Sequence, residues 1–365
     1  MPKKVLLVSR HDYRTGWRAN LHFLADAYRD NGCSVKFVSV GYSPLSLLAS
    51  DHRKLLFKSA NHWETVDGID CYLWRSPIHP FGKGLGNLQS LTNRLFKWWI
   101  QSSCPALDEA AAQADLIIVE SGIGAALMGR LRNAAPNASL VYLVSDLLET
   151  VGAHPFIEDQ LFKDRTAISD IVVVARAMAG HFEAFDRPVH FIQHGISKID
   201  FENIGATPYT APLNIVTVGS MLFDSGFFKI ASDSFPSVQF HLIGTPELEF
   251  KSDNIREYGR MPFKDTLPYL KYANAGIAPY HDQDHADYLA DSSMKLMQYE
   301  YLKLPAICPD FAAGDRHNRY GYRPGNQDSI TTAIQHALAN PFAAEAAEIL
   351  DWKDVANHLM SLGQS

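Results

Sequence analysis

Residues 291–307 read DSSMKLMQYEYLKLPAI, which predicts a helix followed by a short buried strand. Asp291 is expected to cap the helix, because an aspartate side chain accepts hydrogen bonds from the free N–H groups of a first turn. The helix should end before Leu304-Pro305, since proline cannot continue a helix. The apolar residues after it are typical of a buried strand. A helix followed by such a strand is the repeating unit of a parallel α/β fold.

The same helix carries polar side chains that suit a nucleotide sugar. Ser292 and Ser293 fall in the predicted first turn, whose N–H groups and positive dipole end form an anion site. Lys295 can reach a phosphate as a point charge, and Gln298, one turn later, can hydrogen-bond sugar hydroxyls. The pattern predicts a diphosphate and ribose site, although a capped surface helix with one lysine explains the spacing equally well.

Other buried-strand candidates recur with helical patterns between them. In the first half they are residues 5–8, 35–40, 72–74, 116–119, 140–144, 171–174 and 190–192. In the second half they are residues 214–218, 239–243, 255–258, 276–278 and 306–308. Short β-branched runs that alternate with helices indicate parallel sheets covered on both faces.

A segment rich in glycine and proline, residues 200–212, reads as a linker between the two sets of strands. The sequence therefore predicts an α/β protein with two doubly wound, Rossmann-like domains that face a central cleft. They comprise residues 1–200 and 201–340. A helical segment at 341–365 follows, and in two-domain proteins of this build such a helix often packs back on the first domain.

The charge of the chain is uneven. The net charge of −7 over 365 residues argues against a nucleic-acid binder, whose binding face should be basic. Residues 1–100 contain 14 Lys and Arg against 7 Asp and Glu, whereas the remainder contains 19 against 33. The first hundred residues are therefore basic and the rest acidic.

Cysteine spacing and hydropathy set further expectations. The four cysteines, Cys33, Cys71, Cys104 and Cys308, show no paired spacing, so we expect reduced thiols rather than a zinc site or a disulfide framework. The apolar run at residues 5–8 is too short for a signal peptide, and no segment approaches a membrane span. We expect any membrane contact to be at the surface.

Several long segments between about residues 9 and 330 carry a family resemblance. They are His11-Asp12-Tyr13-Arg14-Thr15, Arg18-Ala19-Asn20, Glu120-Ser121-Gly122-Ile123, Ser145-Asp146, Gly219-Ser220-Met221-Leu222-Phe223-Asp224, Gly276-Ile277-Ala278-Pro279-Tyr280, Tyr288-Leu289-Ala290-Asp291-Ser292-Ser293-Met294-Lys295 and Gly321-Tyr322-Arg323-Pro324-Gly325-Asn326. In these segments the chain resembles the GT-B glycosyltransferases, and more narrowly the GumK-type glucuronosyltransferases of the xanthan pathway.

The resemblance implies a function for each predicted domain. It implies an inverting transfer of glucuronate from UDP-glucuronate to a mannose in β-1,2 linkage, in exopolysaccharide biosynthesis. The implied acceptor is a polyisoprenyl-diphosphate-linked oligosaccharide bound by residues 1–200, and the nucleotide sugar is bound by residues 201–340. The implied location is the cytoplasmic face of the inner membrane, as a peripheral protein, and no metal or other cofactor is implied.

Matched residue by residue, the resemblance places the catalytic base on Asp146. It places donor contacts at Met221, Met261, Tyr280, Met294, Lys295 and Gln298, and their neighbours Ser220, Arg260, Ser292 and Ser293 complete the expected donor site. Arg260 stands where the resemblance leads us to expect an acidic residue. On the acceptor side we expect four residues that follow first-domain strands: His11, Asp12, Arg14 and Glu120.

Each of these residues also has a purely structural interpretation. Asp146, just past the strand at 140–144, can act as a general base or cap the next helix. Capping is the favoured interpretation for Glu120. Local turn hydrogen bonds are the alternative for His11, Asp12 and Arg14, core packing for Met221, and packing on the next helix for Tyr280.

A histidine- and aspartate-rich loop resembles a metal site at first sight. Its residues His281, Asp282, Asp284, His285 and Asp287 fit no standard zinc spacing, so we interpret it as a solvated loop.

A second segment is a candidate for docking on an anionic membrane. Residues 80–100 combine apolar and aromatic side chains with Lys83, Arg94 and Lys97, and we group them with Arg53, Lys54 and Lys58. Trp98 and Trp99 suit either the membrane interface or the core.

Three other functions compete with glucuronate transfer. They are transfer from another UDP-sugar, epimerisation of a nucleotide sugar in a similar two-domain fold, and sugar binding without catalysis. The basic, aromatic first domain argues against the epimerase, and the combination of Asp146 with the 292–298 segment argues against a simple binding protein.

Overall fold

The computed structural model describes residues 3–16, 18–49, 51–81, 89–282, 286–340 and 349–362. The chain divides into two compact units. The first comprises Met1–His194 together with Trp352–Ser365, and the second comprises Gly195–Asp351. The chain thus leaves the first unit at His194, six residues before the predicted end of the first domain, and returns to it at Trp352.

The first unit contains a mostly parallel sheet. Among the described residues its strand order is β3-β4-β2-β1-β5-β6-β7-β8. The strands are β1 (Lys4–Ser9), β2 (Ser34–Tyr42), β3 (Trp63–Val66), β4 (Ile69–Arg75), β5 (Leu116–Glu120), β6 (Ser139–Val144), β7 (Asp170–Val173) and β8 (Val189–Phe191). All pair in parallel except β3, which is antiparallel to β4. Strand order reverses between β1 and β5, so the topological switch point lies between their carboxyl ends.

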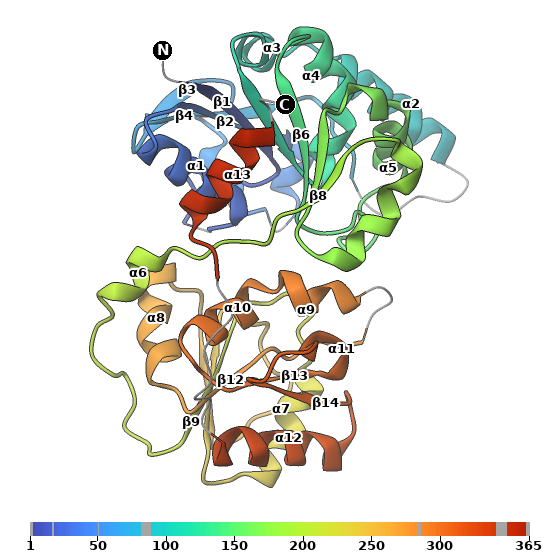
Figure 1. Cartoon of the computed structure of the whole chain (residues 1–365). Helices are drawn as coiled ribbons and strands as arrows, with labels where there is room; N and C mark the ends of the chain where they lie inside the picture. The colour runs from blue at the N-terminus through green and yellow to red at the C-terminus, as the bar shows by residue number, and fades with distance from the viewer. Residues whose placement is uncertain are drawn as a thin grey trace. The chain divides into compact units, whose positions relative to one another are not determined.

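Helices cover both faces of this sheet (Figure 1). The α-helices are α1 (Asn20–Asp30), α2 (Gln89–Gln101), α3 (Pro105–Ala112), α4 (Met128–Ala134), α5 (Pro155–Lys163) and α13 (Trp352–Leu362), with 3-10 segments η1 (Pro44–Leu47), η2 (His52–Leu56), η4 (Ile123–Leu127), η5 (Arg165–Ala167) and η6 (Arg176–Phe185). Figure 1 shows α13, in red, beside α1, in blue. The rings of Trp352 and Phe23 stack there, with centroids 5.6 Å apart.

The second unit contains a parallel sheet of order β11-β10-β9-β12-β13-β14. Its strands are β9 (Asn214–Val218), β10 (Gln239–Ile243), β11 (Ile255–Tyr258), β12 (Ala275–Ile277), β13 (Ala306–Pro309) and β14 (Arg319–Tyr322). Its helices are α6 (Lys198–Glu202), α7 (Ser225–Ser234), α8 (Phe263–Tyr272), η7 (Ala286–Tyr288), α9 (Leu289–Ser292), α10 (Met294–Tyr301), α11 (Asp310–Ala313) and α12 (Gln327–Ala339). The switch point lies between β9 and β12.

The prediction of two doubly wound α/β sheets is confirmed, and each strand predicted from a buried apolar run is present. Strands β3 and β14 were missed. Both lie at sheet edges, where one side of the strand has no partner and polar side chains are tolerated. Their sequences, WETV and RYGY, lack the apolar run by which the other strands were predicted. No described helix has the length and apolar character needed to cross a bilayer.

Candidate active site

A buried carboxyl group lies at the switch point of the first sheet. Glu120 ends β5, and its Oε2 accepts a 2.5 Å hydrogen bond from the hydroxyl of Ser9, which ends β1. Ser145, directly after β6, lies with its hydroxyl 3.4 Å from Oε1. Burial raises the pKa of Glu120 to about 7; the Ser9 hydrogen bond opposes this shift, and the nearby charge of Asp146 adds to it. Three neighbouring strand ends therefore meet at this carboxyl group.

Asp146 lies in the loop after β6, half-buried and close to Glu120. Its backbone N–H donates to the Ser121 hydroxyl over 3.1 Å, which ties the loop to the end of β5. Helix-capping roles for both acids are wrong. The N-cap of η4 is Gly122 and that of α5 is His154, whose Nδ1 accepts from Phe156.

Asp12 and Arg14 bind each other rather than projecting freely from the sheet edge. Two guanidinium nitrogens of Arg14, Nε and Nη2, each lie 2.9 Å from the Asp12 carboxylate, and both side chains are almost fully buried. Arg14 also pairs with Glu64 on β3 over 3.0 Å. The backbone N–H of Arg14 donates to Asp12 Oδ1, so local turn hydrogen bonds of the expected kind are present. The pKa of Asp12 is lowered, since the hydrogen bonds and charge of Arg14 outweigh burial.

His11 belongs to the same loop but has different surroundings. Its backbone N–H donates to the Ser9 hydroxyl over 3.0 Å, which links it to the Glu120 group. Its ring lies 6.3 Å from that of His52, and its Nδ1 is buried with no hydrogen-bond partner among the described residues.

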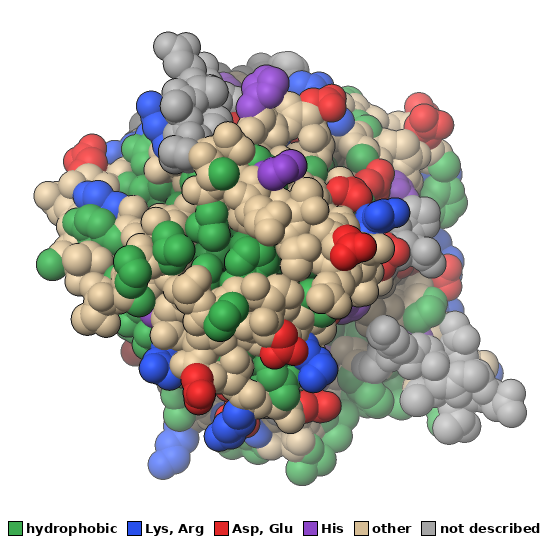
Figure 2. All heavy atoms as spheres, turned by 90° about the horizontal axis from the view of Figure 1, so that it is seen from below, with side chains coloured by type: hydrophobic (Ala, Val, Ile, Leu, Met, Phe, Trp, Pro, Cys, Tyr) green, Lys and Arg blue, Asp and Glu red, His purple; other side chains and the backbone are tan. Residues whose placement is uncertain are grey.

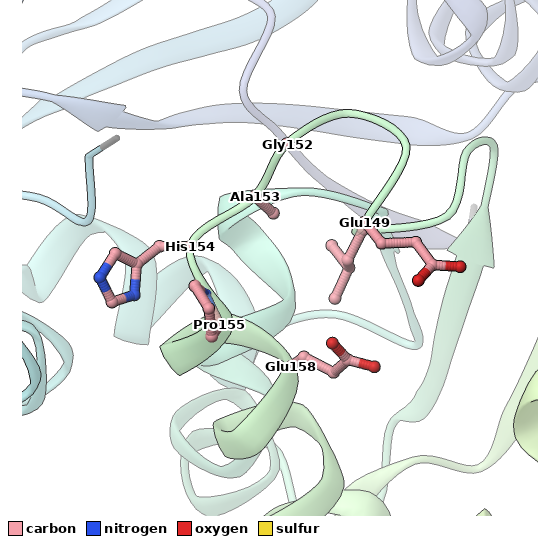
Figure 3. A pocket seen from close by; sticks show the side chains of 7 residues that line it. Glu149, Gly152, Ala153, His154, Pro155 and Glu158 are labelled. Atoms are coloured by element: carbon pink, nitrogen blue, oxygen red, sulfur yellow. The ribbon is translucent and has the colours of Figure 1, made fainter. Parts of the chain in front are cut away.

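A cavity of about 250 Å³ follows Asp146 along the chain. The loop after β6 and the start of α5 line it, and Figure 3 shows the Glu149 and Glu158 carboxyl groups on one side and the His154 ring turned away from them. Its size approaches the lower end of small-molecule sites, about 300 Å³. A cavity of about 650 Å³ lies at the amino ends of β1, β5 and β6. We set that one aside, because ligands of such sheets bind at the carboxyl ends.

In the second unit, two loops meet at the switch point. Phe223, in the loop after β9, forms an antiparallel bridge with Tyr280, in the loop after β12. The loop after β9 begins at Gly219, whose φ of +89° favours glycine. Ser220 is half-buried and Met221 is 43% exposed, so core packing of Met221 is wrong. In the folded chain this methionine is therefore accessible to a ligand.

Lys295 lies beside these loops. Its Nζ is 3.4 Å from the Thr217 hydroxyl on β9 and 5.3 Å from the centre of the Tyr280 ring. No carboxylate of the described residues forms an ion pair with it, and burial lowers the pKa of this lysine to about 7. A desolvated amine without a counter-charge favours a bound anion.

The helix start predicted at Asp291 is wrong. Asp291 lies inside α9, and the chain breaks at Ser293, which is the N-cap of α10 and accepts from the N–H of Leu296 over 3.2 Å. Ser292 therefore ends α9 instead of opening α10, and Met294 and Lys295 occupy the first turn. Tyr280 packs on the start of α10, with its hydroxyl 2.6 Å from that of Ser293. Its alternative interpretation, packing on the next helix, is therefore correct. Gln298 follows half-buried on α10.

Arg260 and Met261 follow β11, on the side of the sheet away from β12. Arg260 is exposed and lies over Gly244, the residue after β10, with its Cγ 3.7 Å from the position of an added Cβ. Met261 is half-buried. Lys295 and Tyr280 are thus in direct contact, whereas Arg260 and Met261 lie in the loop after the edge strand β11.

The remaining predictions concern the surface. Asp284 and His285 lie outside the described residues, and within the described ranges no three His, Cys, Asp or Glu side chains converge as metal ligands. Lys83 also lies outside them. Arg53 is only 1% exposed, so its inclusion in a membrane-facing surface is wrong. Trp98 and Trp99 differ: Trp98 is 49% exposed, whereas Trp99 is in the core and donates to the Ser76 hydroxyl.

The sites of the two units also contain polar residues that were not predicted to be site residues: Ser9, Ser145, Glu149 and Glu158 in the first and Thr217 in the second. Ser9 is the last residue of β1, Ser145 directly follows β6, and Thr217 is the penultimate residue of β9. Their position next to a switch point is the signal that could have found them.

Comparison with known proteins identifies the family. Residues 7–174 match the family model described as glucuronosyltransferase GumK, N-terminal domain. Over 358 residues, 97% of this chain and 88% of the relative, the chain is 37% identical to the UDP-glucuronate:glycolipid 2-beta-glucuronosyltransferase of Xanthomonas campestris pv. campestris.

Solved structures support the fold. Sucrose-phosphate synthase (tll1590) from Thermosynechococcus elongatus matches with a TM-score of 0.68 at 12% identity, over 99% of this chain and 98% of that one. A UDP-forming α,α-trehalose-phosphate synthase from Burkholderia xenovorans, in complex with glucose-6-phosphate, matches with a TM-score of 0.62 at 12% identity, over 99% and 100%. These likenesses show the GT-B fold. Together with the close relative they lead to one conclusion: the chain belongs to the GumK family of glucuronosyltransferases.

Proposed function

We propose that the protein transfers glucuronate from UDP-glucuronate to a mannose of a polyisoprenyl-diphosphate-linked oligosaccharide, in β-1,2 linkage, during exopolysaccharide biosynthesis. The observation that carries the proposal is Lys295, a desolvated amine without a carboxylate partner at the switch point of the second unit. The activity of the 37% identical relative, a UDP-glucuronate:glycolipid 2-beta-glucuronosyltransferase, supports the choice of donor, of a glycolipid acceptor and of the linkage position.

In the proposed donor site, Lys295 and the first-turn N–H groups of α10 neutralise the diphosphate. The exposed Met221, the Tyr280 loop and Gln298 contact the nucleoside and sugar. Ser220, Arg260, Met261, Ser292, Ser293 and Met294 complete the donor side in this proposal. Because Lys295 and the helix N-terminus supply positive charge, the proposed transfer uses no metal.

In the proposed reaction, Asp146 is the general base. Its carboxylate takes the proton of the acceptor hydroxyl, whose oxygen forms a bond to the anomeric carbon of glucuronate. The bond from that carbon to the diphosphate oxygen breaks on the opposite face, UDP leaves, and the anomeric configuration inverts. The cavity beside Glu149 and Glu158 supports an acceptor sugar next to this base, because carboxylates accept hydrogen bonds from sugar hydroxyls.

We also propose that the protein acts at the cytoplasmic face of the inner membrane, where it binds anionic lipid peripherally. Helix α2 supports this with an exposed apolar face, Leu91, Leu95 and Trp98, beside the exposed Arg94 and Lys97. The described atoms on the face shown in Figure 2 carry Lys and Arg interspersed with Asp and Glu. An anionic membrane attracts clusters of Lys and Arg rather than mixed charges, so we do not propose this face as the lipid-binding surface.

The test of the function is Asp146→Asn, which keeps the shape of the side chain and removes the proton acceptor. Turnover with a lipid-linked acceptor should fall about 10²–10⁴-fold, the usual contribution of a positioned base. Calorimetric UDP affinity should be unchanged, because the donor residues belong to the second unit. Wild-type activity should persist in excess chelator, and a panel of UDP-sugars should show preference for UDP-glucuronate.

The matched control is Asp159→Asn, which removes an exposed carboxylate from α5 of the same unit. It should leave turnover unchanged. Near-normal turnover of a folded Asp146→Asn protein would remove the base assignment. Loss of wild-type activity in chelator would remove the metal-independent mechanism.

A further inference from the structure

Two arginines and three histidines gather at the carboxyl edge of the first sheet, around the loop after β1. We call Arg10, His11, His52, Arg53 and His79 the basic cluster. The His11 and His52 rings are stacked at 23° with centroids 6.3 Å apart. The His79 Nδ1 lies 2.9 Å from the hydroxyl of Ser43, the residue after β2. The charges of Arg10 and Arg53 act on both His11 and His79, so these groups form one electrostatic site.

The basic cluster lacks enough negative charge. Within the described ranges the carboxylate that acts on it is Asp51, and Arg53 already holds that carboxylate over 2.8 Å. Arg53 is further saturated by the carbonyl oxygens of Val40 and Gly41, each 2.8 Å away. Arg10 is exposed and forms no ion pair with any described carboxylate. One guanidinium group is therefore left for a ligand.

Burial, with the arginine charges adding to it, keeps His11 and His79 neutral at neutral pH. Burial, then the charges of His22, His52 and the two arginines, lower the pKa of His11 to about 3. Burial, Arg53 and Arg10 lower the pKa of His79 to about 4. The Nδ1 of His11 is also buried without a hydrogen-bond partner among the described residues. A bound anion would accept hydrogen bonds here and offset the repulsion between Arg10 and Arg53.

Exposed apolar side chains lie close in sequence to His52 and Arg53 of the basic cluster. Leu48 and Leu55, just before and within η2, are 87% and 92% exposed, and Lys54 and Lys58 beside them are also exposed. Leucines this exposed, one of them next to Lys54, fit the boundary between lipid chains and anionic headgroups. A phosphate group that carries a hydrocarbon chain matches both halves of this surface.

We propose that the basic cluster binds the phosphate or diphosphate group that links sugar to lipid in the acceptor. This inference rests on the proposed function and adds the position of the acceptor's anionic group. The strand order β4-β2-β1-β5-β6 places the cluster and the Glu120–Asp146 group along one edge of one sheet. An acceptor that lies along this edge has its sugar at Asp146 and its phosphate at Arg10.

The first experiment measures binding of inorganic diphosphate to the full-length chain while saturating UDP occupies the second unit. Arg10→Gln should weaken this binding about 10- to 100-fold, the effect of losing a charge-assisted hydrogen bond. Arg10→Lys, which keeps the charge, should retain most of it. Lys163→Ala, which removes an exposed charge from α5, is the matched control and should change nothing. Equal binding by wild type and Arg10→Gln would overturn the proposal.

The second experiment compares two acceptors with the same oligosaccharide, one joined to its lipid by diphosphate and one by a neutral glycosidic bond. Arg10→Gln should raise the KM for the diphosphate-linked acceptor about 10-fold or more and leave the KM for the neutral one and the UDP affinity unchanged. Equal changes in both KM values, or none, would overturn the assignment.

A third arm uses anionic phospholipid vesicles without acceptor. If Arg10→Gln loses vesicle binding while the two KM values keep their wild-type ratio, the site serves membrane headgroups and the acceptor assignment is wrong. A wild-type protein that transfers glucuronate to neither acceptor would refute the proposed function instead. The diphosphate titration would still report on the site in that case.

Discussion

Glu120 is a carboxyl group whose properties come from its surroundings. It is 7% exposed and bonded to Ser9, and the charge of Asp146 acts on it. Burial disfavours its ionised form, which is why its pKa rises to about 7. Between pH 5 and 6 the folded protein therefore holds a proton that the unfolded chain has mostly released.

This environment predicts how stability depends on pH. Below pH 4.5, the ordinary pKa of this group, the side chain is protonated in both states, so its stabilising contribution is complete. It is lost as pH rises through about 7. Glu120→Gln stays neutral, so its stability relative to wild type should increase by up to about 3 kcal/mol between pH 5 and pH 8. Chemical denaturation of both proteins at the two pH values measures this difference.

Glu183→Gln, on the exposed part of η6, is the control and should show no such pH dependence. A constant stability difference between Glu120→Gln and wild type from pH 5 to pH 8 would contradict the burial argument.

Lys295 presents the opposite case, a cation desolvated before its ligand arrives. Lys295→Ala should weaken UDP binding by about 1.5–3 kcal/mol, because a charge-assisted contact to diphosphate is lost. Uridine, which lacks the diphosphate, should lose little affinity. Gln298→Ala should instead weaken both ligands alike. Calorimetric titration of UDP and uridine into each variant separates the two roles.

Lys251→Ala, an exposed lysine of the same unit, serves as the control and should bind both ligands normally. Equal losses of UDP and uridine affinity in Lys295→Ala would show that the lysine does not contact the diphosphate.

At the scale of elements, α2 shows how one helix separates two adjacent tryptophans. Trp99 and Phe96 face the core, and the opposite face exposes Leu91, Leu95 and Trp98 at helical spacing. Sequence alone left both tryptophans open to either environment. The packing of α2 on the sheet assigns Trp99 to the protein interior and Trp98 to solvent.

This assignment sharpens the membrane prediction. Replacing Leu95 and Trp98 by serine and Arg94 and Lys97 by glutamine, with Trp99 kept, should weaken binding to anionic vesicles. The two charges alone are worth about 2 kcal/mol, or roughly 30-fold, at low salt. Binding of the wild type should fall as salt rises, and UDP affinity should be the same in both proteins. Vesicle sedimentation with and without anionic lipid measures the effect.

The control pair is Phe162→Ser with Lys163→Gln, an exposed apolar and basic pair at the end of α5. It should sediment like wild type. If the α2 variant also sediments like wild type, α2 is not the docking surface.

At the scale of the whole molecule, the chain returns to its first unit. Trp352 stacks on Phe23 and α13 packs on α1, so the last described helix completes the first unit. Local sequence indicated a helix near the C-terminus but gave no information about its partner. The partner depends on a contact between residues more than 300 positions apart.

The extent of sequence-based prediction differs between the fold and the site. Buried strands are short apolar runs. When helices alternate with them, the strands pair in parallel and the helices cover both faces of the sheet. The ten central strands, the edge strands β8 and β11 and the doubly wound class were therefore predictable. The other two edge strands, β3 and β14, were not, because an edge strand tolerates polar side chains and these two, WETV and RYGY, lack an apolar run. The family was recognisable because long motifs preserve specific residues.

The site depended on the tertiary structure wherever a choice required knowing what lies across space. Asp291 and Ser293 are both acceptable caps by residue type, and only the break between α9 and α10 selects Ser293. Asp12 and Arg14 are polar residues after a strand, and only Glu64 and the close packing around them make them a buried ion pair. Ser9, Glu120 and Ser145 are far apart in sequence, and parallel pairing of β1, β5 and β6 brings them together. Local composition determines which elements form, whereas the burial and charge that tune each side chain come from neighbours that only the folded chain supplies.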